Sequence, residues 1–207
     1  MKKIVTPVKK VAAPVLKLKI DNRSSGDYTH NANSKISLVK RFFARAAIHP
    51  FDEVVWEKRI IKISGPQGTL VDAKGLEFPK FWSHNAASIT GAKYFRGSGD
   101  KRETSVKQMI SRVVKTIAGW GERSGYFNTK NEAKIFEDEL AHLLLYQKAA
   151  FNSPVWFNVG VKEKPQCSAC FILQVTDNME SIMDWIHTEA MIFKGGSGAG
   201  INISNLR

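Results

Sequence analysis

The sequence predicts a mixed α/β fold, and three observations support this. Two segments after residue 105 repeat apolar residues with the period of an amphipathic helix. Residues 151–207 contain strand-like and helix-like segments in alternation, together with both cysteines. Hydrophobic residues make up 43% of the 207 residues, which is enough for a packed core. Because a strand pair with one covering helix cannot close a sheet, residues 151–207 are expected to begin a larger domain.

Positive charge is concentrated near the N-terminus. The net charge is +12, and residues 1–49 hold eleven Lys and Arg but two acids, a net charge of +9. Residues 1–40 have no sustained period, so we predict a disordered basic arm, which either keeps the protein soluble or contacts nucleic acid. No apolar run is long enough to span a membrane, and no secretory signal is evident, so we expect a cytoplasmic protein with reduced thiols.

Residues 41–150 are predicted to form a mostly helical domain with one small hairpin. Leu38–Ala47 is predicted as a short helix that ends before a His-Pro pair. Ile60–Ile63 and Thr69–Val71 are predicted strands on either side of a Gly-Pro-Gln-Gly turn. Ser83–Lys93 is predicted as a further short helix.

Two long helices follow in the same region. Ser105 precedes Gln108 by three residues, and Thr129 precedes Glu132 by three, which is the spacing of a capping box at each helix start. Glycines at 121 and 125 are predicted to end the first helix. The predicted apolar faces are Val106, Met109, Ile110, Val113, Ile117 and Trp120 in the first helix, and Phe136, Leu140, Leu143 and Leu144 in the second.

Residues 151–207 are predicted to contain, in order, a polar loop, a strand, a helix, a glycine-rich turn and a second strand. The loop is FNSPVWFNVGV, the first strand lies in QCSACFILQV, and the second strand lies in GINIS. The helix is predicted over residues 178–194. One of its faces, suited to a core or to a dimer interface, consists of Met179, Ile182, Met183, Ile186 and Ala190.

The two cysteines, Cys167 and Cys170, have the Cys-x-x-Cys spacing of a dithiol or of half a zinc site. A tetrahedral zinc site needs four ligands, and the sequence has no second cysteine pair. If the strand begins before Cys167, the two residues lie about 10 Å apart on opposite faces, whereas a disulfide needs Cα atoms within about 7 Å. Two interpretations stay open: one thiol works with a thiol elsewhere, or both are inert and buried.

A glycine-rich run, Gly195–Gly200, follows the predicted helix. Phosphate-binding glycine loops lie after a strand and before a helix, so that helix N–H groups face the anion. Here a helix precedes and a strand follows, which excludes a P-loop and a dinucleotide fingerprint. The glycines either let a substrate approach the backbone or form a helix C-cap and turn, with Lys194 in the last helical turn.

Two further polar positions flank these elements. Asp177 has the spacing of an N-cap, with Glu180 three residues later, and a carboxylate there could also bind a ribose hydroxyl. Ser153 precedes a proline, which holds it extended with its hydroxyl available to a substrate or to a turn. No base is evident near Ser153, so a serine nucleophile is unsupported.

Seven phrases between His49 and Arg207 resemble a single family. They are HPFDEVVWEKR, EFPKFWSHNAA, AKYFRG, GYF, AAFNSPVWFNVGV, QCSACFILQVTDNMESI and FKGGSGAGINISNLR. In this order they resemble the N-terminal part of the adenosylcobalamin-dependent, class II ribonucleotide reductases. The last three phrases are the most specific, and residues 1–48 lie outside the resemblance.

The resemblance implies a ten-stranded α/β barrel behind a helical N-terminal region, with residues 151–207 as the start of the barrel. It implies reduction of ribonucleoside diphosphates to deoxyribonucleotides, for DNA synthesis, by thiyl-radical chemistry. It also implies adenosylcobalamin as the cofactor and a thioredoxin-like protein as the reductant.

The resemblance also assigns roles to single residues. Cys170 matches the first member of the reducing cysteine pair, and Cys167 matches no catalytic position. Asp177 and Lys194 match contacts to a deoxynucleoside triphosphate effector, and helix 178–194 between them matches a dimer helix. The positions that match substrate contacts are Ser153, Ala169, Cys170 and Gly198.

Other parts of the family site have no match in this sequence. These are the radical cysteine, the second reducing cysteine and most of the cobalamin site, and no metal ligands are predicted. We therefore expect catalysis only with a complementary C-terminal chain that carries the rest of the barrel. The alternative is a basic nucleic-acid-binding or regulatory protein that keeps the reductase region as a scaffold. Salt-dependent DNA binding through residues 1–40 would distinguish it.

Overall fold

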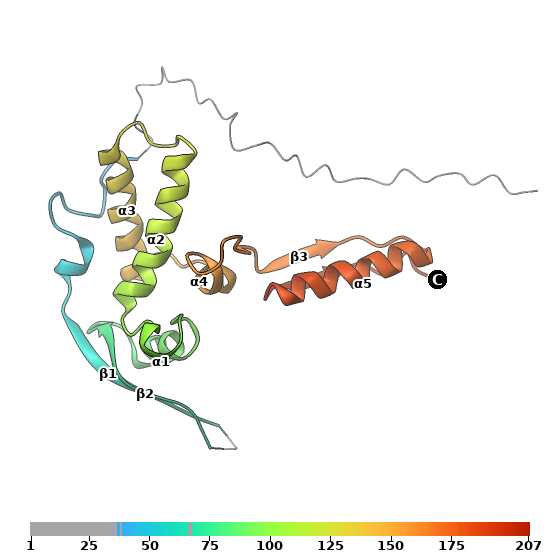
Figure 1. The fold of residues 1–207 in the computed structure, drawn as a ribbon, viewed down its shortest axis with the longest axis horizontal. Coiled ribbons are helices and arrows are strands. Elements are labelled where there is room, and N and C mark those ends of the chain that lie inside the picture. Colours follow the sequence, from blue (N-terminus) through green and yellow to red (C-terminus); the bar gives the residue numbers. More distant parts are fainter. Residues whose placement is uncertain (1–36, 38, 66–67) are drawn as a thin grey trace, which may run out of the picture.

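The computed structural model describes residue 37 and residues 39–207, except residues 66 and 67 (Figure 1). The predicted basic arm lies almost wholly outside the described residues. In chain order the elements of the described residues are the 3₁₀ helix η1 (Pro50–Glu53), β1 (Trp56–Gly65), β2 (Gly68–Pro79), α1 (His84–Lys93), the 3₁₀ helix η2 (Gly99–Lys101), α2 (Val106–Arg123), α3 (Lys130–Leu145), α4 (Ser153–Asn158), β3 (Cys170–Leu173), α5 (Met179–Lys194) and β4 (Gly198–Ile201).

The strands β1 and β2 confirm the predicted hairpin, although both are longer than Ile60–Ile63 and Thr69–Val71. They pair antiparallel, with register shifts in the middle of the hairpin. The part of β2 that extends beyond the predicted strand includes Leu76 and Phe78, whose side chains are buried in the core. Helix α1 packs on this end of the hairpin through Gly91, where a Cβ atom would lie 2.9 Å from Cδ1 of Leu76.

The helices α1, α2 and α3 confirm three predicted helices. Both hydrogen bonds of the capping box at Ser105 are present, and the Ser105 backbone N–H donates to Oε1 of Gln108 at 3.1 Å. At the start of α3, Oγ1 of Thr129 accepts from the backbone N–H of Glu132 at 3.1 Å. Helices α2 and α3 lie side by side (Figure 1).

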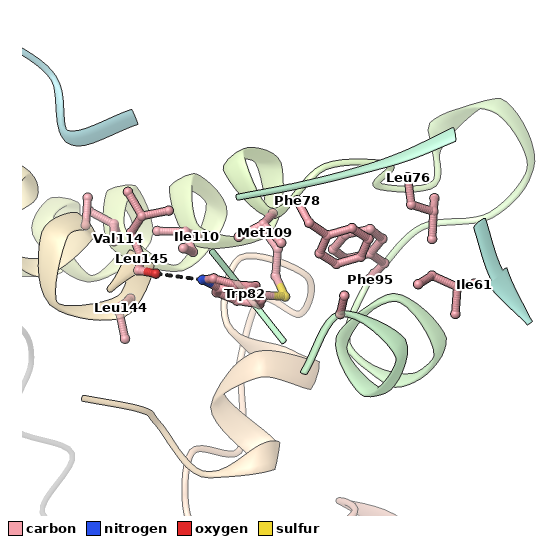
Figure 2. Packing of buried hydrophobic residues seen from close by; sticks show 13 residues of the cluster. Ile61, Leu76, Phe78, Trp82, Phe95, Met109, Ile110, Val114, Leu144 and Leu145 are labelled. Atoms are coloured by element: carbon pink, nitrogen blue, oxygen red, sulfur yellow. Dashed lines mark hydrogen bonds between the residues drawn. The ribbon is translucent and has the colours of Figure 1, made fainter. Parts of the chain in front are cut away.

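The main core joins the hairpin, α1, α2 and α3 (Figure 2). The rings of Phe78 and Phe95 stack with their centroids 5.7 Å apart. Nε1 of Trp82 donates to the backbone carbonyl of Leu145 at 2.8 Å, which ties the segment before α1 to the end of α3. The core therefore fixes the helical region from which α4 and the following strands extend.

The predicted helix over Leu38–Ala47 is wrong. Residues 39–47 contain bends and a turn but no helix. The backbone N–H groups of Phe42, Phe43 and Ala44 donate to the carboxylate of Glu139 on α3, at distances of 2.8–3.1 Å. In a helix these groups would donate to carbonyls four residues earlier, so the carboxylate takes the place of helical hydrogen bonds.

Glu139 is expected to stabilise the fold above pH 4.5. Burial raises its pKa, but the three backbone N–H donors and His142 outweigh burial, so the net pKa lies below its ordinary value of 4.5. Glu139→Gln should therefore cost about 2 kcal/mol at pH 7, typical for hydrogen bonds to a buried charge. The difference from the parent chain should shrink as the pH falls below 4.5, through the folded-state pKa, because the parent then loses the same charge.

Urea unfolding of both chains at pH 7 and at pH 3.5 measures this difference. Glu137→Gln, on the same helix, is the matched control and should change stability by less than about 0.5 kcal/mol. A Glu139→Gln penalty that is equal at the two pH values would contradict the role of the ionised carboxylate.

The last third of the chain confirms the predicted order of strand, helix and strand. Strands β3 and β4 are parallel neighbours, and α5 is the crossover connection that a parallel pair requires. Strand β4 begins at Gly198, earlier than the predicted GINIS segment, because it pairs with β3 from Cys170 onward. In Figure 1, β3 and α5 extend away from the helical region. None of the described helices is long and apolar enough to cross a membrane.

Candidate functional site

The strand pair brings three of the predicted substrate positions together. Cys170 is the register partner of Gly198. The backbone N–H of Gly198 also donates to the carbonyl of Ala169 at 2.7 Å. Cys170 and Gly198 are 28 positions apart in sequence and become neighbours only because β3 and β4 are parallel and adjacent.

Cys170 lies on the open face of this strand pair. Exposure alternates along β3, so that Cys170 and Ile172 are exposed while Phe171 and Leu173 are half-buried. Ile172 is 88% exposed. An apolar side chain and a thiol on one uncovered face form a surface that could contact a ligand or further protein.

The two thiols are both free and exposed. The strand begins at Cys170 and does not include Cys167, so the strand-geometry argument against a disulfide does not apply here. The thiol of Cys167 lies 3.7 Å from the carbonyl of Pro165, in the loop before the strand. The prediction that both thiols are buried is therefore wrong, and their chemical role stays a prediction.

Ser153 lies in a helix, whereas a polar loop was predicted. Asn152 caps the helix by accepting from the backbone N–H of Val155, and Pro154 occupies its first turn, where a proline costs no hydrogen bond. Oγ of Ser153 lies 2.9 Å from the hydroxyl of Tyr94, the C-cap residue of α1. The structure thus holds Ser153 against α1.

A chain of hydrogen bonds connects α4 to the strand pair. Nδ2 of Asn158, the last residue of α4, donates to the carbonyl of Gln166 at 2.9 Å. Nε2 of Gln166 donates to Oγ of Ser197 at 2.6 Å, and this hydroxyl donates to the carbonyl of Ser168 at 2.5 Å. Asn158 and Ser197 are both buried. The sequence reasoning missed the roles of Gln166 and Ser197, since the only available signal was that both are polar residues within the matched phrases.

The predicted effector positions lie at opposite ends of α5. Asn178, not Asp177, is the N-cap of α5, because its side chain accepts from the backbone N–H of Ser181 at 2.8 Å. Asp177 instead forms an ion pair with Arg207. Lys194 is the last residue of the helix and is exposed. A helix of 16 residues is about 24 Å long, so one chain does not bring the two positions together.

The helix α5 presents an uncovered apolar stripe. Met179, Met183 and Ile186 follow one another at helical spacing and are 69%, 51% and 50% exposed. The prediction that residues 178–194 form an amphipathic helix is confirmed. The exposed residues belong to the face that was assigned either to a core or to a dimer interface.

Three of the cavities in the described residues do not include Cys170. They have volumes of about 260, 360 and 390 Å³ and lie in the helical region. No group of three or more His, Cys, Asp or Glu side chains arranged to hold a metal ion is found in the part of the chain that the structure describes.

Comparison with known proteins identifies two matching families. Residues 57–147 match the family model described as class II vitamin B12-dependent ribonucleotide reductase. Residues 168–207 match the model described as the ribonucleotide reductase barrel domain.

Individual relatives agree with these matches. A vitamin B12-dependent ribonucleotide reductase of Streptomyces clavuligerus is 51% identical over 173 residues, which cover 82% of this chain and 18% of the relative. One from Rhodopirellula baltica is 40% identical, over 76% of this chain and 18% of the relative. The large subunit of a ribonucleoside-diphosphate reductase from African swine fever virus is 47% identical over 55 residues, 27% of this chain.

The chain thus spans about 18% of the length of the first of these relatives. The two matched segments correspond to the two parts of the structure. The first covers the hairpin and α1–α3, and the second covers β3, α5 and β4. The chain belongs to the class II, vitamin B12-dependent ribonucleotide reductase family.

Proposed function

We propose that this chain supplies the N-terminal part of a class II ribonucleotide reductase, which reduces ribonucleotides to deoxyribonucleotides for DNA synthesis. The observation that carries the proposal is the exposed Cys170 beside Gly198 on the open face of the strand pair. We further propose that residues 41–150 form the N-terminal domain and that residues 151–207 are the first part of a ten-stranded barrel.

Cys170 is the proposed electron donor. In the reaction, the ribose 2′ hydroxyl leaves as water while two thiols lose two electrons and two protons and become a disulfide. Cys170 supplies one thiol, and the second comes from a barrel strand outside this sequence. Cys170 is free and exposed on β3 and forms no disulfide with Cys167, which supports this division of roles.

Substrate binding is proposed for Ser153, Ala169, Cys170 and Gly198. The Ser153 hydroxyl and the backbone around Ala169 and Gly198 would hold the diphosphate and the ribose. Gly198 supports close approach because only the Ala169 carbonyl, at 3.8 Å, lies near the position of a Cβ atom there.

Effector binding and dimerisation are proposed for α5. A two-fold dimer places identical surfaces against each other. If the two α5 helices pack antiparallel through Met179, Met183 and Ile186, then Asp177 of one copy lies beside Lys194 of the other. This arrangement would bring both effector residues to one deoxynucleoside triphosphate, although they lie at opposite ends of the helix in a single chain.

The relatives are named for vitamin B12 dependence, and we propose that the complete enzyme uses adenosylcobalamin, which would supply the radical that starts the reaction. Most of its binding residues are assigned to the rest of the barrel, because the resemblance matches little of the cobalamin site in this sequence. A thioredoxin-like reductant, a ribonucleoside diphosphate substrate and a cytoplasmic location complete the proposal.

Reconstitution tests the proposed function. The chain is combined with a polypeptide that covers the remainder of the Streptomyces clavuligerus relative, and deoxycytidine diphosphate formation from cytidine diphosphate is measured with adenosylcobalamin and dithiothreitol. Turnover is expected only when both polypeptides and the cofactor are present. Full turnover by this chain alone, or none by the combination although the two polypeptides co-purify, would overturn the proposal.

A further inference from the structure

We propose that Gln166 is a positioning residue, which fixes the spacing between the two strands of the substrate site and links them to α4. The inference rests on the proposed function and adds a residue that touches no substrate itself. Its backbone carbonyl binds Asn158 of α4, and its side-chain amide binds Ser197 at the entrance to β4. One residue therefore contacts both elements that carry the proposed substrate contacts.

The direction of the hydrogen bonds requires a donor in the side chain at position 166. The Ser197 hydroxyl has one proton and donates it to the Ser168 carbonyl, so it can only accept from a second partner. The Gln166 Nε2 group is such a donor, at 2.6 Å. A carboxylate at position 166 would be a second acceptor competing for the same proton. Ser197 is buried, so water does not easily replace the lost partner.

The position of these bonds matters because the strand pair is short. Strands β3 and β4 pair over four residues each. The first pair is Cys170 and Gly198, and Ala169, whose carbonyl accepts from the Gly198 N–H, lies just before it. The Ser168–Ser197 bond is immediately before that rung. A loss of this bond would let the strands separate at the end where Ala169 and Gly198 meet.

The glycine run supplies an independent observation. Gly195 has a φ of −74°, which any residue adopts, so its backbone conformation does not require glycine. A Cβ atom at Gly195 would instead lie 3.0 Å from each of Cδ, Nε2 and Oε1 of Gln166. The structure therefore uses glycine at position 195 to make room for the Gln166 amide.

Three variants test the proposal in the reconstituted, complete reductase. Gln166→Glu should raise KM for cytidine diphosphate about three- to tenfold, the effect of one lost hydrogen bond, and should lower kcat less than twofold. Gly195→Ala should raise KM in the same direction because it displaces the amide. Gln174→Glu is the control, an exposed glutamine just after β3 that should leave both constants unchanged.

A double variant separates positioning from general damage. In the Gln166→Ala background, Gly195→Ala should have no further effect, because the side chain that it displaces is gone. Independent, additive effects of the two substitutions would contradict the proposal. A loss of kcat with KM unchanged would also contradict it, because that result indicates a smaller folded fraction and not a displaced site.

Hydrogen exchange provides a readout that does not depend on activity. The Gly198 amide donates to Ala169 and should exchange about three- to tenfold faster in Gln166→Glu complexes, from the same lost hydrogen bond. If the parent assembly shows no turnover but exchange at Gly198 accelerates, the proposed function fails and the positioning role stands. If the parent is active while KM and exchange do not change in Gln166→Glu, the positioning role fails alone.

Discussion

Replacing Cys170 with serine is expected to abolish ribonucleotide reduction in the reconstituted enzyme. The hydroxyl of serine cannot be oxidised to a disulfide, so the two electrons that reduce the ribose have no source at this position. Turnover should fall on the order of 10³-fold or more, as for other essential catalytic groups. Single-turnover deoxycytidine diphosphate formation, measured without external reductant, detects this loss directly.

The second cysteine provides the matched control. Cys167 is exposed in the loop before β3 and is not part of the strand pair. Cys167→Ser should therefore keep turnover within about twofold of the parent, as expected of a surface position. Thiol counting before and after a single turnover should show Cys170 protected from alkylation only after reaction. Equal activity of the Cys170→Ser and Cys167→Ser enzymes would rule out Cys170 as the electron donor.

Replacing Phe78 with alanine is expected to cause the largest loss of stability. Phe78 points from β2 toward α1 and is fully buried. Its ring stacks on Phe95, and its centroid lies 6.4 Å from that of the Trp82 ring. Removing a buried phenylalanine side chain typically costs about 3–5 kcal/mol, because transfer free energy is lost and a cavity remains. Urea unfolding followed by tryptophan fluorescence measures the loss, since Trp82 reports on this part of the core.

A neighbouring phenylalanine on the surface serves as the comparison. Phe81 is 51% exposed and stacks on Tyr146 with ring centroids 5.3 Å apart. Phe81→Ala should cost about 1 kcal/mol, the value of one exposed aromatic pair. If the two variants lose similar stability, the assignment of Phe78 to the centre of the core is incorrect.

Local signals were sufficient wherever a structural element is stabilised mainly by its own residues. The capping residue Ser105 and the apolar period after it predicted α2, and the order of strand, helix and strand after α4 was also predicted. Hydrogen bonds between residues at most four positions apart and a periodic apolar face both depend on residues that are close in the sequence. A single sequence therefore reveals them.

Local signals failed where a distant group supplied the hydrogen bonds. Residues 39–47 have a helix-like composition. However, the carboxylate of Glu139, about a hundred positions later, accepts hydrogen bonds from backbone N–H groups in this segment. Asp177 has the spacing of an N-cap, yet it pairs with Arg207 while Asn178 caps α5. Both outcomes depend on which segments meet in space, and no short-range pattern contains that information.

The sequence by itself determined the family and the strand–helix–strand order, because motif spacing and chain order are properties of the sequence. It also led to the prediction that Cys170 is the electron donor. Only the tertiary structure decided that Cys170 and Gly198 share a rung, that Gln166 connects α4 to both strands, and that Gly195 provides space for an amide. These relations join residues that are far apart in the chain, and they arise when α5 crosses over to make β3 and β4 parallel neighbours.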